Sequence, residues 1–286
     1  LLEENIVSGG PPKDGIPSVD GPSYTTAEEA DSWLLPNDVV FGVEYEGFIA
    51  AYPQRILVWH EIVNETVNDD RVAIAYCPLT GSVIGYKGLI PPDVQSTFGV
   101  SGKLVNSNLI MYDRASDSYW PQILGRAIKG TSKGSSLKEF PIVWTSWEKW
   151  KRRHPNTKVL SQKTGFIRNY GTDGDPYGSY INDDQGYYTS RRVFFKPIYE
   201  DMRLAPKEVV VGMRDEKGNA LAIVKDSLRE RKTIEASLGE RTVVATYDSD
   251  LDSYSAKIKD TGEWINAFDV MWFAWIGYYP DSSLVQ

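Results

Sequence analysis

From residue 39 onward the chain is dominated by runs of β-branched and aromatic residues separated by turn-forming residues. The runs at 39–43, 48–52 and 71–76 are typical of strands, and Gly47 marks a turn between the first two. Short helical stretches are predicted over 27–33, 146–153 and 270–276, the last two each carrying a pair of Trp residues on one face. The pattern therefore predicts a mainly β (β-rich α+β) protein with a few short helices.

The strand-like runs recur late in the chain, at residues 209–213, 219–224 and 241–247. The helical ends match too: Trp147 and Trp150 are followed by His-Pro, and Trp272 and Trp275 are followed by Tyr-Pro at the same spacing. We interpret the chain as two related β-rich halves that arose by internal duplication, each ending in a short Trp-bearing helix.

This interpretation divides the chain into four parts. Residues 1–36 are an extended, Pro/Gly-rich N-terminal lead with one short helix, and residues 37–160 form the first half. Residues 161–205 form a loop-rich connecting segment, and residues 206–286 form the second, shorter half. The second half lacks an equivalent of residues 98–141, so we expect an insertion in the first half.

Composition and charge exclude several classes of partner and site. The net charge of −8 argues against nucleic acid, because phosphate binding needs clustered Lys and Arg. A single cysteine excludes an internal disulfide and any zinc or iron–sulfur site with several cysteines. No apolar run approaches the roughly 20 residues that cross a bilayer.

The scarce soft residues gather in the first half. Cys77 is the only cysteine, His60 is one of two histidines, and Met111 is one of four methionines and lies in the insertion. In the second half Arg231 occupies the position of His60, and Asp248 that of Cys77. The strand framework therefore does not require His or Cys, which favours a specific role for both.

Thiolate, imidazole and thioether together are the ligands that copper selects. We therefore predict a copper (soft-metal) site in which Cys77 supplies a thiolate, His60 an imidazole and Met111 a weaker third ligand. A second hypothesis makes Cys77 a nucleophile with His60 as its base. A third makes the protein a non-catalytic module that binds through its Trp- and Tyr-rich surface. In that case His60 and Cys77 are packing residues, since free cysteine is commonly buried.

A weaker cluster of acidic residues lies in the connecting segment. Asp173 and Asp175 are followed by Asn182, Asp183 and Asp184, but the spacing is not that of an EF-hand. We interpret this stretch as a solvated turn.

Five motifs resemble one family along nearly the whole chain. They are "AYPQRILVWHEIVN", "YCPLTG", "FGVSGKL", "MYDR" and "TSWEKWKRRHPNTKVLS". The chain is similar to the bacterial and archaeal group called domain of unknown function 3179, to which no activity is assigned. The resemblance implies an exported or lipid-anchored protein, hence an extracytoplasmic location.

The family commonly has Cys-Pro-Leu-Cys-Gly where this chain has Cys77-Pro-Leu-Thr80-Gly. Since Thr80 replaces the second thiol, a dithiol–disulfide cycle has no partner thiol within this chain. We predict an extracytoplasmic copper protein for electron transfer, metal handling or oxidation. Its expected partners are the metal ion and a redox partner protein, without nucleic acid. We expect membrane contact only through an N-terminal anchor missing from the given chain.

Overall fold

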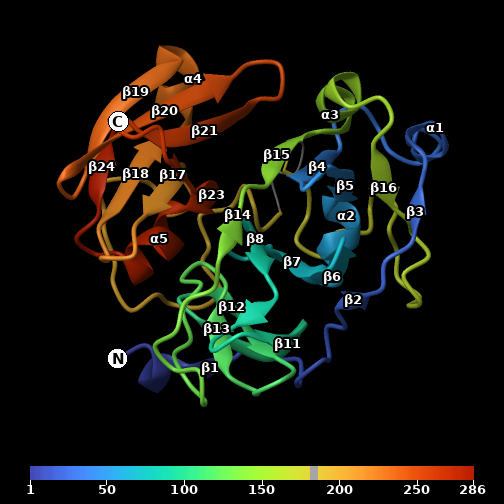
Figure 1. The fold of residues 1–286 in the computed structure, drawn as a ribbon, viewed down its shortest axis with the longest axis horizontal. Coiled ribbons are helices and arrows are strands. Elements are labelled where there is room, and N and C mark those ends of the chain that lie inside the picture. Colours follow the sequence, from blue (N-terminus) through green and yellow to red (C-terminus); the bar gives the residue numbers. More distant parts are fainter. Residues whose placement is uncertain (181–185) are drawn as a thin grey trace.

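A computed structural model describes residues 1–180 and 186–286 of the chain (Figure 1). Strands dominate these residues, so the prediction of a mainly β fold is confirmed. The helices are η1 (Glu3–Asn5), α1 (Ala27–Ala30), α2 (Gln54–Leu57), α3 (Trp147–Arg153), α4 (Lys225–Arg231) and α5 (Trp272–Tyr278). The helices predicted over 27–33, 146–153 and 270–276 correspond to α1, α3 and α5. The sequence pattern does not predict α2 and α4, which are one or two turns long and show no apolar period of their own.

The first half contains two sheets among the described residues, with strand orders β15-β4-β5-β16-β3 and β14-β8-β7-β6-β2. Their strands are β2 (Val19–Asp20), β3 (Tyr24–Thr25), β4 (Val39–Tyr45), β5 (Phe48–Pro53), β6 (Ile62–Val67), β7 (Asp70–Cys77), β8 (Ser82–Lys87), β14 (Glu139–Phe140), β15 (Val143–Ser146) and β16 (Lys158–Leu160). The N-terminal lead supplies β2 and β3 as edge strands, so it lies along the body of the first half.

The second half repeats this arrangement with strand orders β23-β17-β18-β24 and β19-β20-β21-β22. Its strands are β17 (Val209–Arg214), β18 (Ala220–Val224), β19 (Thr233–Leu238), β20 (Arg241–Asp248), β21 (Ser253–Ile258), β22 (Trp264–Ile265), β23 (Ala267–Met271) and β24 (Ser283–Val285). The strand that follows the terminal helix pairs in parallel with an earlier strand in both halves: β16 pairs with β5, and β24 pairs with β18. The shared order supports two related halves, while the duplication itself stays a prediction.

The first half carries an additional sheet with the order β1-β11-β12-β13. Its strands are β1 (Val7–Ser8), β11 (Phe98–Val105), β12 (Asn108–Asp113) and β13 (Tyr119–Pro121), and the small hairpin β9 (Leu89–Ile90) and β10 (Val94–Gln95) precedes β11. Residues 88–138 separate β8 from β14, whereas only residues 259–263 separate β21 from β22. The insertion therefore spans residues 88–138, beginning earlier than the predicted 98–141.

A tryptophan packed on a glycine joins the terminal helix of each half to its sheet. Trp150 of α3 lies over Gly42 of β4, and a Cβ atom at Gly42 would overlap its ring. Trp275 of α5 lies over Gly212 of β17 in the same way. Both indoles are buried and donate a hydrogen bond to a hydroxyl seven residues later, on Thr157 or Ser282. The predicted Trp-bearing helices thus serve the same packing role twice.

The halves meet at β8 of the first and β23 of the second, which lie side by side near the middle of the molecule (Figure 1). The backbone N–H of Met271 donates to the carbonyl of Thr80, at the turn that follows Cys77. A buried ion pair between Glu139 and Arg214 also crosses this boundary, with 2.5 Å between its closest atoms. One continuous hydrophobic cluster, to which Cys77 and Met111 belong, extends through both halves.

Candidate functional site

Cys77 ends β7 and begins the turn that returns the chain into β8. Its side chain is only 1% exposed. The thiol accepts a hydrogen bond from the backbone N–H of Leu109, at 3.4 Å, and lies 3.8 Å from the carbonyl of Ser107. Both partners come from the insertion, whose β11–β12 hairpin therefore covers the thiol. Burial, together with the negative charge of Glu61, raises the pKa of Cys77 to about 11.

Met111 lies on β12, fully buried, in the same hydrophobic cluster as Cys77. Leu109 and Met111 are two residues apart on one strand, so they share a face of the additional sheet. Leu109 and Met111 both belong to the cluster around Cys77, whereas Ile110 between them belongs to another. The structure therefore brings two of the three predicted soft ligands into one cluster.

His60 has different surroundings. It lies in the turn after α2, fully buried, with its Nδ1 atom 2.7 Å from the carbonyl of Pro17 and its Nε2 atom 2.6 Å from the hydroxyl of Tyr170. Its ring also contacts Phe166. Burial lowers the pKa of His60. No hydrogen bond or ring contact within residues 1–180 and 186–286 joins it to Cys77, and both ring nitrogens are engaged by other groups.

Glu61 is the residue that sequence reasoning missed. It is 7% exposed, and within the described part of the chain no hydrogen bond or ion pair engages its carboxyl group, whose oxygens are not among the fully buried polar atoms without a partner. Burial raises the pKa of Glu61 to about 8. Its negative charge also raises the pKa of Cys77, an electrostatic effect second to that of burial. A buried carboxyl group without a partner is costly, which marks this position as a candidate site.

The backbone explains why His60 and Glu61 diverge. Glu61 has φ of 56°, in the left-handed region, between the turn after α2 and β6. Its N–H donates to the carbonyl of Leu57, and its carbonyl accepts from Tyr76. This conformation turns the chain between the two residues, which end in different surroundings. The signal available in the sequence was the charge of Glu61 between two buried neighbours.

Three tyrosines complete the surroundings of Cys77. Tyr177 and Tyr187 come from the connecting segment and Tyr278 from α5, and a charge on Cys77 would raise the pKa of each. The Tyr187 hydroxyl donates to the carbonyl of Leu79 at 2.7 Å, and the Tyr278 hydroxyl donates to the carbonyl of Val105 at 3.1 Å. The charge of Glu61 also raises the pKa of Tyr177. The site therefore contains a thiol, a carboxyl group and a phenol from separate segments.

A cluster of four polar side chains nearby has all of its hydrogen-bonding partners. The side chains of Thr80, Ser82, Asn108 and Gln122 are buried and hydrogen-bonded to one another beside the Cys77 turn. The Thr80 hydroxyl also lowers the pKa of the Cys77 thiol slightly against the larger effect of burial. These neutral side chains stabilise the turn, whereas the carboxyl of Glu61 has no such partner.

The acidic stretch of the connecting segment is only partly a solvated turn. Asp173 is exposed, but Asp175 is half-buried and accepts from Gln54 at 2.8 Å and from the Tyr188 hydroxyl at 3.1 Å. Burial raises the pKa of Asp175. The interpretation is therefore wrong for Asp175, which holds the connecting segment to the first half. Asn182, Asp183 and Asp184 lie outside the described residues.

Metal-ligating side chains are sparse in the described part of the chain. No group of three or more His, Cys, Asp and Glu side chains among those residues is placed to hold a metal ion. Cys77, Glu61 and Tyr177 influence one another's pKa, and no hydrogen bond among the described residues joins the three side chains. In addition, no helix of the described residues is long and apolar enough to span a membrane.

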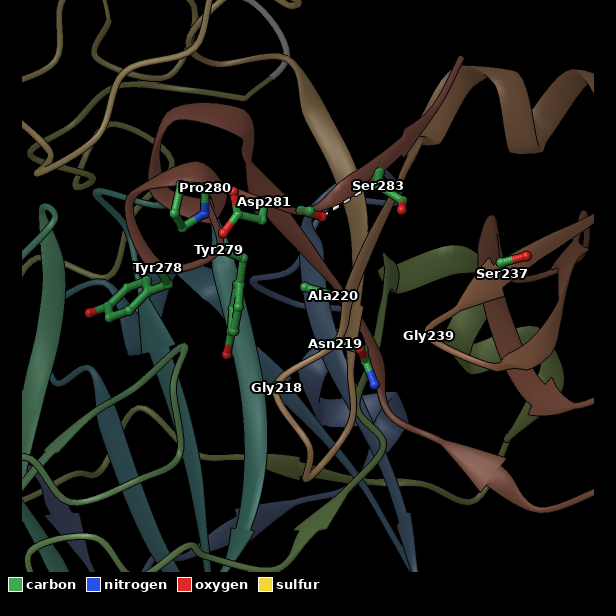
Figure 2. A pocket seen from close by; sticks show the side chains of 11 residues that line it. Gly218, Asn219, Ala220, Ser237, Gly239, Tyr278, Tyr279, Pro280, Asp281 and Ser283 are labelled. Atoms are coloured by element: carbon green, nitrogen blue, oxygen red, sulfur yellow. Dashed lines mark hydrogen bonds between the residues drawn. The ribbon is translucent and has the colours of Figure 1, made fainter.

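A surface hollow borders this site only through Tyr278 of α5. It has a volume of about 390 Å³ and lies in the second half, between the turn at Gly218, the turn at Gly239 and the end of α5 (Figure 2). Tyr278 and Tyr279 lie along it in Figure 2, with Asp281 beside them. It contains none of the predicted site residues, and small polar groups line most of it.

The fold and the site define a mainly β protein of two similarly ordered halves, in which the first half holds a buried thiol and a buried carboxyl group that interact electrostatically. A family model described as "Protein of unknown function (DUF3179)" matches residues 13–263, and the chain belongs to this family. No curated protein and no solved structure matches the chain significantly.

Proposed function

We propose that the protein binds one transition-metal ion, copper first among the candidates, between the Cys77 thiolate and the Glu61 carboxylate. The phenol of Tyr177 is the third ligand of the proposed site. The observation that carries this proposal is a largely buried carboxyl group, without an ion pair among the described residues, that interacts electrostatically with the only thiol of the chain. This ligand set revises the predicted one, because His60 already has two hydrogen-bonding partners.

Charge balance supports a divalent ion at this place. Burial raises the pKa of Cys77 to about 11 and that of Glu61 to about 8, so both groups are largely neutral at pH 7. A divalent cation that displaces both protons leaves the net charge of the buried site unchanged. The cost of burying either charge alone is then offset by the ion. Thiolate is a soft ligand that suits copper and zinc, and of these two copper is the one that can transfer electrons.

Burial also favours electron transfer and metal handling over oxidation of a substrate. Cys77 is 1% exposed, and the insertion, the connecting segment and α5 all cover it. A centre covered in this way suits electron transfer or metal storage better than reaction with a substrate. We keep a redox partner protein and an extracytoplasmic location as parts of the proposal.

The nucleophile hypothesis has less support. A reactive cysteine needs a depressed pKa and a base within reach, but burial raises the pKa of Cys77. His60, the expected base, contacts Pro17 and Tyr170 instead.

The test is a titration of metal-free protein with Cu(I) and with Cu(II), read by bound copper per chain and by a thiolate-to-Cu(II) absorption band. We expect one ion per chain and release of about two protons per Cu(II) at pH 7. Apparent affinity should rise with pH, more steeply below about 8, where the protons on Glu61 and Cys77 both compete, than above it, where only the proton on Cys77 does.

The variants separate this ligand set from its alternatives. Removing an outer-shell partner costs 10–100-fold in metal affinity, so Cys77→Ser and Glu61→Gln should each cost at least about 100-fold. Asp248→Asn and Lys232→Gln, at the matching positions of the second half, should bind copper as the wild type does. His60→Gln should also bind copper normally. If this variant binds no copper, the originally predicted ligand set of His60, Cys77 and Met111 is favoured instead. Met111→Leu tests whether the thioether of Met111 also binds the ion. Equal binding by the wild type and Cys77→Ser would overturn the proposal.

A further inference from the structure

A smaller hollow of about 310 Å³ lies at the boundary between the halves. Gly81 and Trp144 of the first half, Tyr180 of the connecting segment, and Lys207 and Met271 of the second half contribute to its lining. We call this hollow the interhalf cleft. It is large enough for a small organic molecule, and boundaries of this kind are frequent ligand sites.

One wall of the interhalf cleft is apolar and rigid. The rings of Trp144 and Tyr180 meet edge to face, with centroids 5.3 Å apart and planes at 88°. Tyr180 is also stacked on Tyr188 at 3.7 Å. Met271 lies against Gly81, whose φ of 56° is left-handed. This wall matches the flat face of an aromatic ligand.

The three basic residues of the interhalf cleft differ in their partners. Lys225 is paired with Asp269 at 2.5 Å, and Arg229 is paired with Asp252 at 2.9 Å. Lys207 instead donates to the carbonyl of Tyr187 and to the Ser190 hydroxyl, and its ammonium lies 3.3 Å from the centre of the Tyr187 ring. In the described part of the chain no carboxylate contacts Lys207.

Lys207 is therefore a half-buried cation without a paired carboxylate among residues 1–180 and 186–286. Burial lowers the pKa of Lys207 to about 8, as expected for an ammonium that lacks a carboxylate. Three carboxylates, those of Glu208, Asp226 and Asp269, also line the interhalf cleft. Asp269 is paired with Lys225 and Asp226 with Arg229, so Lys207 is the cation of the lining that is left for an anionic ligand group. An anion there would balance the charge of this ammonium.

We propose that the interhalf cleft binds a small aromatic carboxylate, with its ring against Trp144 and Tyr180 and its carboxylate on Lys207. The proposal goes beyond copper binding and does not depend on it, because none of these residues belongs to the Cys77–Glu61 pair.

Benzoate is the probe, and benzamide, of the same shape without the charge, is its control. Isothermal titration of the full chain should show saturable benzoate binding in the micromolar to millimolar range, as a ligand of this size allows. Benzamide should bind at least about 10-fold more weakly, because a hydrogen bond to a charged group contributes more than a neutral one. Equal affinities would overturn the proposal, as would the absence of saturable benzoate binding.

Variants locate the site. Lys207→Met should lower benzoate affinity about 10- to 100-fold, and Lys207→Arg, which keeps the charge, should retain most of it. Lys217→Met, at an exposed turn of the second half, is the matched control and should bind benzoate normally. Unchanged affinity in Lys207→Met, with its folding verified by circular dichroism, would rule out the cleft as the site. Copper binding should be unchanged in Lys207→Met, so failure of either proposal leaves the other testable.

Discussion

The two halves of the molecule use the same backbone twice and bury different side chains on it. Glu61 and Lys232 occupy matching positions after α2 and α4, with φ of 56° and 66°. The backbone carbonyl of each accepts a hydrogen bond from a backbone N–H of the neighbouring strand. Tyr76 donates to Glu61 at 2.7 Å, and Tyr247 donates to Lys232 at 2.8 Å. The left-handed conformation at Glu61 is therefore a feature of the shared fold and is not by itself evidence of function.

The difference lies in the side chains and in what covers them. Lys232 is exposed, while Glu61 is buried. Asp248, at the position of Cys77, accepts hydrogen bonds from the backbone of its own turn and pairs with Arg153 at 3.1 Å. Cys77 instead is covered by the insertion, which the second half lacks. The comparison separates what the fold requires from what the first half adds.

The largest effect is expected for Glu61→Gln against Lys232→Gln. The pKa of Glu61 is raised from 4.5 to about 8, so the folded chain keeps a proton that the unfolded chain loses. Stability should therefore fall as the pH rises from about 4.5 to about 8 and level off above it. Glu61→Gln should raise the free energy of unfolding by about 3–5 kcal/mol at pH 8 and by far less at pH 5.

Urea unfolding at both pH values measures this effect. Lys232→Gln should change the free energy of unfolding by less than about 0.5 kcal/mol at either pH. A Glu61→Gln variant no more stable than the wild type at pH 8 would show that the carboxyl is ionised or paired in solution.

A smaller contrast is expected in thiol reactivity. A cysteine at the second-half position, Asp248→Cys in a Cys77→Ser background, should be half-exposed and react readily with iodoacetamide at pH 8. Cys77 in the wild type should react at least about 100-fold more slowly, since burial raises its pKa to about 11 and blocks access. Alkylation rates followed by mass spectrometry measure the ratio. Comparable rates would mean that the insertion opens readily over Cys77.

The smallest difference between the halves is expected at the shared packing contact. A methyl group at Gly42 or Gly212 would overlap the ring of Trp150 or Trp275. Gly42→Ala and Gly212→Ala should each lower the free energy of unfolding by about 1–3 kcal/mol, the usual cost of overpacking a core. Thermal unfolding of both variants tests whether these positions respond alike. If only one variant is destabilised, the two contacts are not equivalent.

Much of the architecture could be predicted from local pattern. The runs at 39–43 and 209–213 lie within β4 and β17, and the Trp pairs lie on α3 and α5 as predicted. Local chemistry suffices there because β-branched runs, turn glycines and closing prolines act on the dihedrals of their own neighbourhood. The short helices α2 and α4 could not be predicted in this way, because the strands around them determine where the chain turns.

The candidate site was only partly predictable for the same reason. Cys77 could be singled out by its rarity and by its absence from the second half, and Met111 by its place in the insertion. Glu61 could not, because its importance arises from its burial and from its electrostatic interaction with Cys77 and Tyr177, residues distant in sequence. His60 was assigned to the thiol on rarity alone, whereas Pro17 and Tyr170 engage its ring.

The sequence by itself determined the β-rich fold, the order of elements in the two halves and the single thiol. Only the tertiary structure decided which charged group shares the surroundings of that thiol and which cation in the interhalf cleft lacks an anion. The physical reason is that strand and turn preferences depend on neighbouring residues. The energy of a buried charge depends instead on every segment that removes water from it.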